Sequence, residues 1–338
     1  MNRRVTHQIH KGYGKVILFG EHFVVHGAKA VVATLAQYTS CALTLEEGII
    51  TPGGRDGNSV VGVGLCPPVD RRKYTTPMNS TKVTLQRQSH DIVLKHLGID
   101  LSTSRLTATL EGDLVCGGGV GASACDVVAF ARALNELYSL KLSDEQINEA
   151  ALEGEKAAHG TPSGIDNTAA TYGGILVYQR LPEKGPVFEK LIEKGMLTKP
   201  LYLVVVSTGI TTSTVETIAS VRALRAADEA KFLSILQEYE TVLQDGIQSL
   251  KQGSLAQLGE AMNRNHTLCQ AIAVSCTELD VIVERAKAME GLCLGAKMSG
   301  TGRGGIAIAL CSDERSQHRV AEELRKLPEA KFVWEYSV

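Results

Sequence analysis

Aromatic residues and long apolar runs are scarce in this chain of 338 residues. Only 5% of the residues are Phe, Trp or Tyr, whereas 44% are hydrophobic, which predicts a globular protein with an aliphatic core. No segment approaches the run of about 20 apolar residues that a membrane-spanning helix needs. We therefore expect a soluble protein with no membrane partner.

An excess of charge of one sign is also lacking. The 35 basic and 37 acidic residues give a net charge of −2, which gives no electrostatic reason to expect a nucleic-acid partner. The eight cysteines are scattered singly, and no spacing among them matches a zinc clip. Because no apolar signal segment precedes them, we expect reduced thiols in the cytoplasm, with an organelle as the alternative.

The two familiar glycine fingerprints of nucleotide-binding proteins are absent or weak. The lysine-bearing pattern Gly-x-x-x-x-Gly-Lys-Ser/Thr does not occur. Gly117-x-Gly119-x-x-Ala122 matches a relaxed dinucleotide pattern and follows a strand candidate at 106–110. The acidic ribose ligand expected about 20 residues later would be near Glu136, which lies inside a predicted helix. The sequence therefore favours neither a P-loop protein nor a dinucleotide-binding protein.

Glycine itself is concentrated in three segments, of which the middle one is the most informative. It lies between the strand candidate and a helix predicted over 125–138. Its predicted phosphate-binding residues are Gly117, Gly118, Gly119, Val120, Gly121, Ala122, Ser123 and Ala124. Small residues free the backbone N–H groups, and the helix N-terminus adds partial positive charge, so this segment predicts a polyphosphate cradle.

The remaining pattern predicts mixed α and β structure. Apolar, β-branched runs predict strands at 15–19, 30–45, 175–178 and 201–206, and helical spacing predicts helices over 143–159 and most of 215–253. Residues 48–82 predict a long excursion, and the Pro, Gly and Lys residues of 181–200 predict a break between domains. The third glycine segment, 300–305, precedes a strand and predicts a hairpin or tight turn.

Two carboxylates follow the predicted phosphate loop. Glu155 ends a predicted helix, and Asp166 lies beyond the turn Gly160-Thr161-Pro162-Ser163-Gly164. Phosphoryl transfer to an alcohol needs an Mg²⁺ ligand and a carboxylate near the nucleophilic hydroxyl, and two separate acids suit these tasks. Taken alone, each has a simpler interpretation. Asp166 would cap a helix, and Glu155 would lie on a solvated helix face.

The first glycine segment carries a resemblance to a known family. It reads Gly14-Lys15-Val16-Ile17-Leu18-Phe19-Gly20-Glu21-His22, followed by Val24-Val25-His26-Gly27. Together with the other motifs, in the same order from Lys15 to Gly305, it resembles the GHMP small-molecule kinases, named for galactokinase, homoserine kinase, mevalonate kinase and phosphomevalonate kinase. The resemblance implies an α+β protein with an N-terminal ATP-binding domain over 1–190, containing a left-handed β-α-β unit. A ferredoxin-like C-terminal domain would span 191–338.

The resemblance also implies an activity and a set of roles. The activity is Mg²⁺-dependent transfer of phosphate from ATP to the 5-hydroxyl of mevalonate, in isoprenoid synthesis. Asp166 and Lys15 would be catalytic, and Ser123 and Glu155 would bind Mg²⁺. The implied substrate-binding residues are Lys15, Glu21, His22, Asp166, Thr208 and Gly300. Two alternatives stay open, another small-alcohol kinase such as a galactokinase or phosphomevalonate kinase, and a non-catalytic nucleotide-binding relative. The oligomeric state is open too, with a homodimer among the possibilities.

Four departures from the family pattern accompany the resemblance. Gly12-Tyr13 stands where Ala-Pro is common, and Ala122 replaces the first of two usual serines. Gly209 and Thr212 stand where basic residues are frequent in the family, so the residue that recognises the carboxylate of the substrate is not predicted. Arg303 interrupts the last glycine run, and it is a candidate for positive charge toward this carboxylate.

Overall fold

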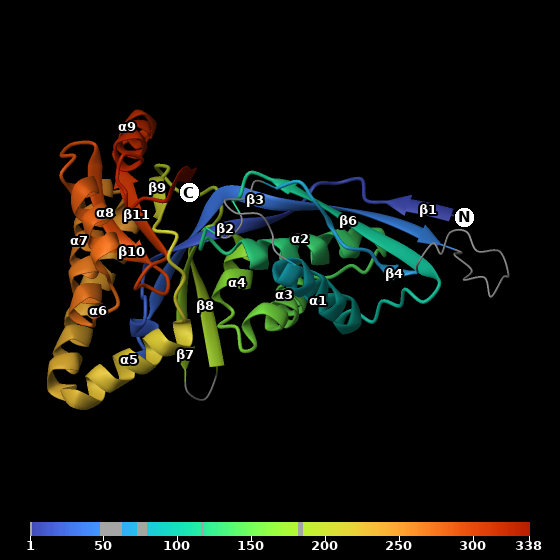
Figure 1. The fold of residues 1–338 in the computed structure, drawn as a ribbon, viewed down its shortest axis with the longest axis horizontal. Helices are drawn as coiled ribbons and strands as arrows, with labels where there is room; N and C mark the ends of the chain where they lie inside the picture. Colours follow the sequence, from blue (N-terminus) through green and yellow to red (C-terminus); the bar gives the residue numbers. More distant parts are fainter. Residues whose placement is uncertain (1, 48–62, 73–79, 116–117, 182–184) are drawn as a thin grey trace. The chain divides into compact units, whose positions relative to one another are not determined.

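The computed structural model describes residues 2–47, 63–72, 80–115, 118–181 and 185–338, whose path is drawn in Figure 1. The chain separates into two compact units. Unit 1 comprises 1–14 and 37–172, and unit 2 comprises 15–36 and 173–338. Strands β2 (His10–Phe19) and β3 (Ala30–Glu47) contribute residues to both. The boundary expected between residues 190 and 191 stays a prediction.

Unit 1 contains a sheet that has, besides its share of β2 and β3, β1 (Asn2–Val5), β4 (Gly64–Leu65), β5 (Val69–Asp70) and β6 (Ser104–Gly112). In this sheet β3 pairs with β1, β2 and β6, and β6 pairs with β4 and β5. β6 pairs antiparallel with β3, with Thr39 opposite Gly112 and Leu45 opposite Leu106, whereas β4 and β5 run parallel to it. Alternate residues of β6 are buried, which is the pattern of a strand with one covered face.

Helices cover this sheet. They are α1 (Ser80–His96), α2 (Ala122–Leu137), α3 (Asp144–His159) and α4 (Ile165–Tyr172). Figure 1 shows α1, α2 and α3 on the same side of β3 and β6, and α3 packs against the other three helices. Because β5 runs parallel to β6 and α1 lies between them in the chain, the three elements form a β-α-β unit. The mixed α+β class predicted from the sequence is confirmed.

Local sequence signals explain where these helices begin. Ser143 caps α3 by accepting a hydrogen bond from the Gln146 backbone N–H, and the Gln146 side chain accepts one from the Ser143 N–H. This capping box confirms the helix predicted over 143–159. The helix predicted over 125–138 is also confirmed, although it begins earlier, directly after Gly121. Helix α1 was not predicted, because its sequence is polar and only a narrow stripe that includes Val93 is buried.

Unit 2 contains a four-stranded antiparallel sheet with the order β10-β11-β9-β12. Its elements in chain order are β9 (Tyr202–Ser207), α5 (Thr214–Ala227), α6 (Glu229–Gln252), α7 (Leu255–Ala271), α8 (Thr277–Lys287), β10 (Cys293–Ser299), β11 (Ile306–Cys311), α9 (Glu314–Leu324) and β12 (Phe332–Ser337). With α5 to α8 counted as one helical connection, the chain follows the order β-α-β-β-α-β, and the first strand lies between the third and the fourth. This is the ferredoxin-like arrangement that the resemblance to the GHMP kinases implies.

The rest of unit 2 precedes that sheet in the chain. The first half of β3 pairs antiparallel with β7 (Ile175–Leu181), and β7 pairs in turn with β8 (Gly185–Ile192). The segment 181–200, expected to be a break between domains, therefore contains a paired strand. Its mixture of Pro, Gly and Lys concealed β8, which is exposed or half-exposed along its length. Within the described part of the chain, no helix is long and apolar enough to cross a membrane.

The contact between α7 and β10 depends on two glycines. A Cβ atom added to Gly259 would lie 2.2 Å from the Leu294 carbonyl oxygen, and one added to Gly295 would lie 2.1 Å from the Gly259 carbonyl oxygen. Helix and strand thus approach backbone to backbone. Neither glycine has a positive φ, so the constraint here is space and not conformation.

We expect Gly259→Ala to lower the free energy of unfolding by about 1–3 kcal/mol, since the added methyl group forces α7 away from β10. Urea denaturation followed by circular dichroism measures this loss. Gln257→Ala, at an exposed position of the same helix, is the control and should leave the midpoint unchanged. Equal stability of wild type and Gly259→Ala would contradict the close contact.

Candidate active site

The predicted phosphate loop leads into α2 through glycines in the left-handed region. Gly117 lies outside the described residues, whereas Gly118 is buried and Gly119 is exposed. Gly119 has φ 74° and Gly121 has φ 77°, values that residues with a Cβ atom rarely adopt. Gly121 is the N-cap of α2, and no described side chain caps this end. The helix terminus therefore presents backbone N–H groups with partial positive charge, as an anion-binding site requires.

Close packing fixes the start of α2. A Cβ atom at Gly12 would lie 2.0 Å from the Cys125 carbonyl oxygen, so only glycine allows β2 to approach the helix this closely. The Cys125 thiol lies 2.9 Å from the Tyr13 carbonyl oxygen and 3.0 Å from that of Gly121, and it donates to them. The departure from Ala-Pro at Gly12-Tyr13 therefore has a structural reason, because an alanine at the first position would collide with α2.

Ser123 and Glu155 meet at this helix end. The Ser123 hydroxyl, in the first turn of α2, donates to Glu155 Oε1 at 2.5 Å. The Glu155 side chain is 3% exposed, and its second oxygen lies 3.6 Å from His159 Nε2. The interpretation of Glu155 as a solvated helix residue is therefore wrong. A hydroxyl and a buried carboxylate beside a phosphate-binding helix end are hard oxygen donors, which are the donors that Mg²⁺ prefers.

Asp166 lies in the first turn of α4 and is half-buried. The helix is tied to α3 next to it, since Asn167 donates to the Asn148 side-chain oxygen at 2.7 Å. Asn148 also donates to the Thr168 hydroxyl at 3.2 Å. Unit 1 thus holds the loop, the Ser123–Glu155 pair and Asp166 on packed helices. Lys15 belongs to unit 2, so its proximity to Asp166 stays a prediction.

A buried network of charges lies at the second turn of α2 and was not predicted. Asp126 accepts from Gln86 at 2.7 Å and lies 2.9 Å from His90 Nε2. Arg72 Nη2 lies 3.7 Å from Asp126 and is paired with Asp70. Burial opposes ionisation of Asp126, but His90 and Arg72 outweigh it and lower the pKa of the carboxyl. The network ties α1 and the segment 69–72 to the helix that carries the phosphate loop.

In unit 2, the Gly-Glu-His motif forms a strained turn between β2 and a short 3-10 helix, η1 (Phe23–His26). His22 has φ 58°, in the left-handed region, which costs about 1–3 kcal/mol for a residue with a Cβ atom. Its Nε2 lies 2.6 Å from the Thr301 carbonyl oxygen. Such strain persists only where the surroundings enforce it, so contacts with the rest of unit 2 must hold the turn.

The side chain of Glu21 points into the interior of unit 2. Its carboxylate forms an ion pair with Lys297 of β10, and both side chains are 0% exposed. Burial raises the pKa of Glu21, and the neighbouring ammonium group opposes that rise. Glu21 Oε2 has no hydrogen-bond partner among the described residues. Its role as a substrate-binding residue stays a prediction, but this burial makes an indirect role more consistent with its position.

His22 is also buried, and one of its ring nitrogens has no partner among the described residues. Burial lowers its pKa, so the ring is neutral near pH 7, and its Nε2–H donates to Thr301. Nδ1 is then a hydrogen-bond acceptor, buried and without a partner in the described part of the chain. A purely structural role for His22 would account for the hydrogen bond of Nε2 but would leave Nδ1 unexplained.

The third glycine segment joins β10 to β11, which pair antiparallel from Ser299 and Ile306 onward. The hairpin predicted from the sequence is therefore confirmed. Gly300 has φ 89°, and a Cβ atom there would meet nothing within 4 Å. Thr208 lies beside this hairpin, and its hydroxyl donates to the Gly305 carbonyl oxygen at 3.2 Å. The substrate contacts expected of Gly300 and Thr208 stay predictions.

Arg303 is anchored within unit 2. Its Nε donates to the Ala273 carbonyl oxygen at 3.1 Å and its Nη1 to the Ser220 hydroxyl at 3.0 Å. These bonds give the guanidinium group a structural function at the base of the hairpin. The suggestion that it recognises the substrate carboxylate stays a prediction.

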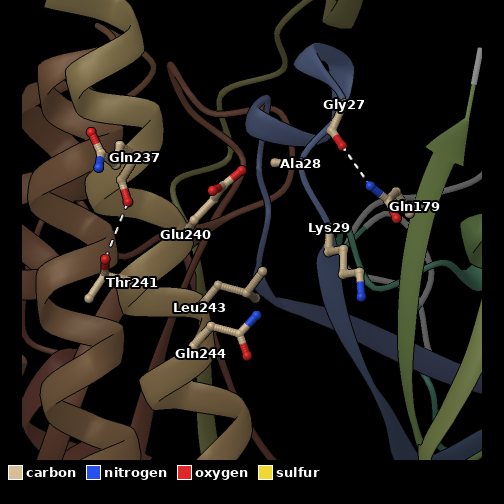
Figure 2. Close-up of a pocket in the computed structure, with 9 residues that line it drawn as sticks. All are labelled: Gly27, Ala28, Lys29, Gln179, Gln237, Glu240, Thr241, Leu243 and Gln244. Carbon is tan, nitrogen blue, oxygen red and sulfur yellow. Dashed lines mark hydrogen bonds between the residues drawn. The ribbon is translucent and has the colours of Figure 1, made fainter.

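Unit 2 also contains a polar pocket of about 430 Å³ between α6 and the segment that leads into β3. Figure 2 shows Lys29 and Gln179 on one side of it and Gln237 and Glu240 of α6 on the other. No residue of the predicted site is among the described residues that line it. This pocket is therefore separate from the predicted site residues, which in unit 1 gather at the start of α2 and in unit 2 at the His22 turn.

Comparison with known proteins gives the family. The model of the N-terminal domain of GHMP kinases matches residues 85–174, and the model of the C-terminal domain matches residues 247–330. The mevalonate kinase of Thermococcus gammatolerans is 31% identical over 309 residues, which cover 90% of this chain and 89% of that protein. The chain belongs to the GHMP kinase family. The resemblance read from its motifs is confirmed.

Two further relatives agree with this membership. The mevalonate kinase of Aeropyrum pernix is 29% identical over 320 residues, 91% of either chain. The crystal structure of L. major mevalonate kinase in complex with R-mevalonate is 43% identical, with a TM-score of 0.90, and covers 99% of this chain and 97% of that one. The two-domain GHMP kinase fold is thus present over nearly the whole length.

The packing around β10 predicts a pH dependence of stability. Burial lowers the pKa of His266 to about 4, and its Nδ1 accepts from the Met298 N–H at 3.3 Å. In the unfolded chain His266 binds a proton as the pH falls through about 6.5, whereas in the folded chain it stays neutral down to about pH 4. The stability that depends on the neutral ring is therefore fully present above pH 6.5 and is lost as the pH falls toward 4. We expect a loss of about 3 kcal/mol between pH 7 and pH 4.

Urea unfolding of wild type and His266→Gln across this range isolates the contribution, because the variant should lack this part of the slope. His318→Gln, at an exposed histidine, is the control and should keep the wild-type slope. Parallel curves for wild type and His266→Gln would contradict the assignment.

Proposed function

We propose that the chain transfers the γ-phosphate of ATP to the 5-hydroxyl of mevalonate, which gives 5-phosphomevalonate and ADP in isoprenoid synthesis. The observation that carries this proposal is the 43% identity, over almost the whole chain, to an enzyme solved with R-mevalonate. The oxygen donors and backbone N–H groups at the start of α2 support the binding of Mg·ATP. The His22 turn supports the binding of the acceptor alcohol. The compartment and a homodimer stay predictions.

The loop residues Gly118 to Ala124 would receive the phosphates of ATP. Backbone N–H groups at an uncapped helix end stabilise phosphate oxygens without needing a lysine in the loop. The contact between Ser123 and Glu155 fits an Mg²⁺ site, because both supply hard oxygens next to the phosphates. When bound there, Mg²⁺ would neutralise charge on the phosphate oxygens and help to orient them.

We assign to Asp166 the role of accepting the proton from the hydroxyl of the acceptor. A carboxylate within hydrogen-bond reach orients the hydroxyl and takes its proton as the new bond forms. Lys15 would stabilise the negative charge that develops beside it. His22, with Nδ1 as an acceptor, is suited to a hydroxyl of the substrate.

Release of ADP by the purified protein with Mg·ATP tests the proposal, with mevalonate, galactose, homoserine and phosphomevalonate offered separately. We expect turnover with mevalonate alone. Turnover with another acceptor would retain phosphoryl transfer but reject mevalonate as the substrate. ATP binding without turnover on any of the four would favour a nucleotide-binding relative without catalysis.

If Asp166 accepts the proton, removing its charge should slow the chemical step without weakening the binding of ATP. We expect Asp166→Asn to lower kcat by about 10²–10⁴-fold, while the Kd for ATP stays within about threefold of wild type. Steady-state kinetics and titration with ATP measure the two effects. Asp144→Asn, which removes an exposed carboxylate, is the control. A wild-type kcat in Asp166→Asn would remove Asp166 from proton transfer.

The metal site predicts a different phenotype. We expect Glu155→Gln to raise the Mg²⁺ concentration needed for half-maximal rate by about tenfold or more, since a ligand charge is lost. Ser123→Ala should shift the requirement in the same direction. Glu153→Gln, on the same helix and paired with Lys156 at the surface, should leave it unchanged. An unaltered Mg²⁺ dependence in Glu155→Gln would reject Glu155 as a ligand.

A further inference from the structure

The Gly20-Glu21-His22 turn is held by contacts with one strand and the hairpin that follows it. Lys297 of β10 is paired with Glu21. Two residues further along the strand, Ser299 Oγ accepts from the Ile17 N–H at 3.1 Å and donates to the Ile17 carbonyl oxygen at 2.9 Å. All of these residues belong to unit 2. The strand that leads into the turn and the turn itself are thus fastened to β10.

The hairpin that follows β10 contacts the turn as well. His22 is bonded to the carbonyl oxygen of Thr301, which directly follows Gly300. β10 therefore contacts the strand before the turn and Glu21 within it, and the hairpin after β10 contacts His22. Lys297 is the charged member of this series, and no sequence motif pointed to it.

The position of the Lys297 ammonium group is closely defined. It is completely buried, and its Nζ also donates to the Met298 carbonyl oxygen at 2.6 Å. β10 therefore orients the ammonium group with its own backbone, and the ammonium group orients Glu21. The side chains of Glu21 and Lys297 are both 0% exposed. An effect of this pair on a ligand would therefore pass most directly through the neighbouring residue, His22.

The conformation of His22 shows why such an anchor matters. Its φ of 58° is unfavourable for a residue with a Cβ atom, so the turn would relax if its contacts were weakened. Relaxation would move the ring and with it Nδ1, the acceptor that has no partner in the described residues. A ligand that donates a hydroxyl hydrogen to Nδ1 needs that atom held in place.

We propose that Lys297 is a positioning residue, which fixes the strained Gly20-Glu21-His22 turn through Glu21 and so holds His22 Nδ1 ready for a hydroxyl of the acceptor substrate. The proposal deepens the function proposed above and rests on it for the identity of the substrate. The rival explanation is that the ion pair stabilises unit 2 and has no influence on His22.

Three variants separate these explanations. Lys297→Met leaves the buried carboxylate without its cation, and Glu21→Gln leaves the ammonium group without its anion. The double variant Glu21→Gln/Lys297→Met removes both charges, which in buried ion pairs often restores stability. Lys287→Met is the matched control, because it breaks an exposed lysine–glutamate pair with Glu284 on α8.

Steady-state kinetics at saturating Mg²⁺ gives the first readout. We expect the mevalonate KM of Lys297→Met to rise by about tenfold or more, with the ATP KM within about twofold of wild type. The double variant should recover the wild-type melting temperature more closely than either single variant but keep the raised mevalonate KM. A double variant with both wild-type stability and wild-type mevalonate KM would overturn the proposal.

A second readout does not depend on the substrate. In protein labelled with ¹⁵N-histidine, the His22 ring signals, identified by their loss in His22→Gln, report the Nε2–H tautomer and its bond to Thr301. We expect Lys297→Met and the double variant to shift or broaden these signals, and Lys287→Met to leave them unchanged. Unchanged His22 signals in both Lys297 variants would overturn the proposal.

The kinetic and NMR readouts test the proposed function and the role of Lys297 separately. If wild type does not phosphorylate mevalonate but the His22 signals change in Lys297→Met, the proposed function fails and the positioning of His22 stands. If wild type phosphorylates mevalonate and neither the signals nor the mevalonate KM change, the proposed function stands and the role of Lys297 is rejected.

Discussion

The constraint on which the candidate site of unit 1 depends is a helix that begins without a capping side chain. The N-terminus of α2 starts at a glycine in the left-handed region, and no side chain of the N-cap bonds to its first N–H groups, which suits them to binding an anion. A helix end left in this state is costly unless the surroundings hold it. Gly12 supplies close backbone packing, and the buried contacts of Asp126 anchor the next turn. The Ser123–Glu155 contact then adds two oxygen donors at the same place.

Unit 2 holds its own candidate residues in a different way. There a buried ion pair and a glycine hairpin hold a turn that is strained at His22. Four of the five residues with positive φ in the hairpin at 300–305 are glycines, and the fifth is Arg303. Both units therefore combine small residues, which permit an unusual backbone, with buried polar contacts, which make that backbone the stable one.

Much of the fold and of the candidate site could be predicted from the sequence, because the residues that determine each element are close together in the chain. The capping box of α3, the helix after Gly121 and the hairpin at 300–305 each depend on residues close together in the chain. Helix α1 was missed because its polar sequence lacks such a signal. Lys297 was missed for another reason, since its partner lies 276 positions away and no pattern relates the two. The buried role of Arg72 was concealed in the same way, as it reads like part of a short basic cluster.

The most direct measurement is the identity of the product. With Mg·ATP and mevalonate carrying ¹³C at carbon 5, a phosphate transferred to the 5-hydroxyl gives a ³¹P signal split by coupling to that carbon. Transfer to the 5-hydroxyl predicts this split signal, growing in step with ADP. Inorganic phosphate in place of a phosphomonoester, or a phosphomonoester whose signal is not split, would contradict transfer to the 5-hydroxyl.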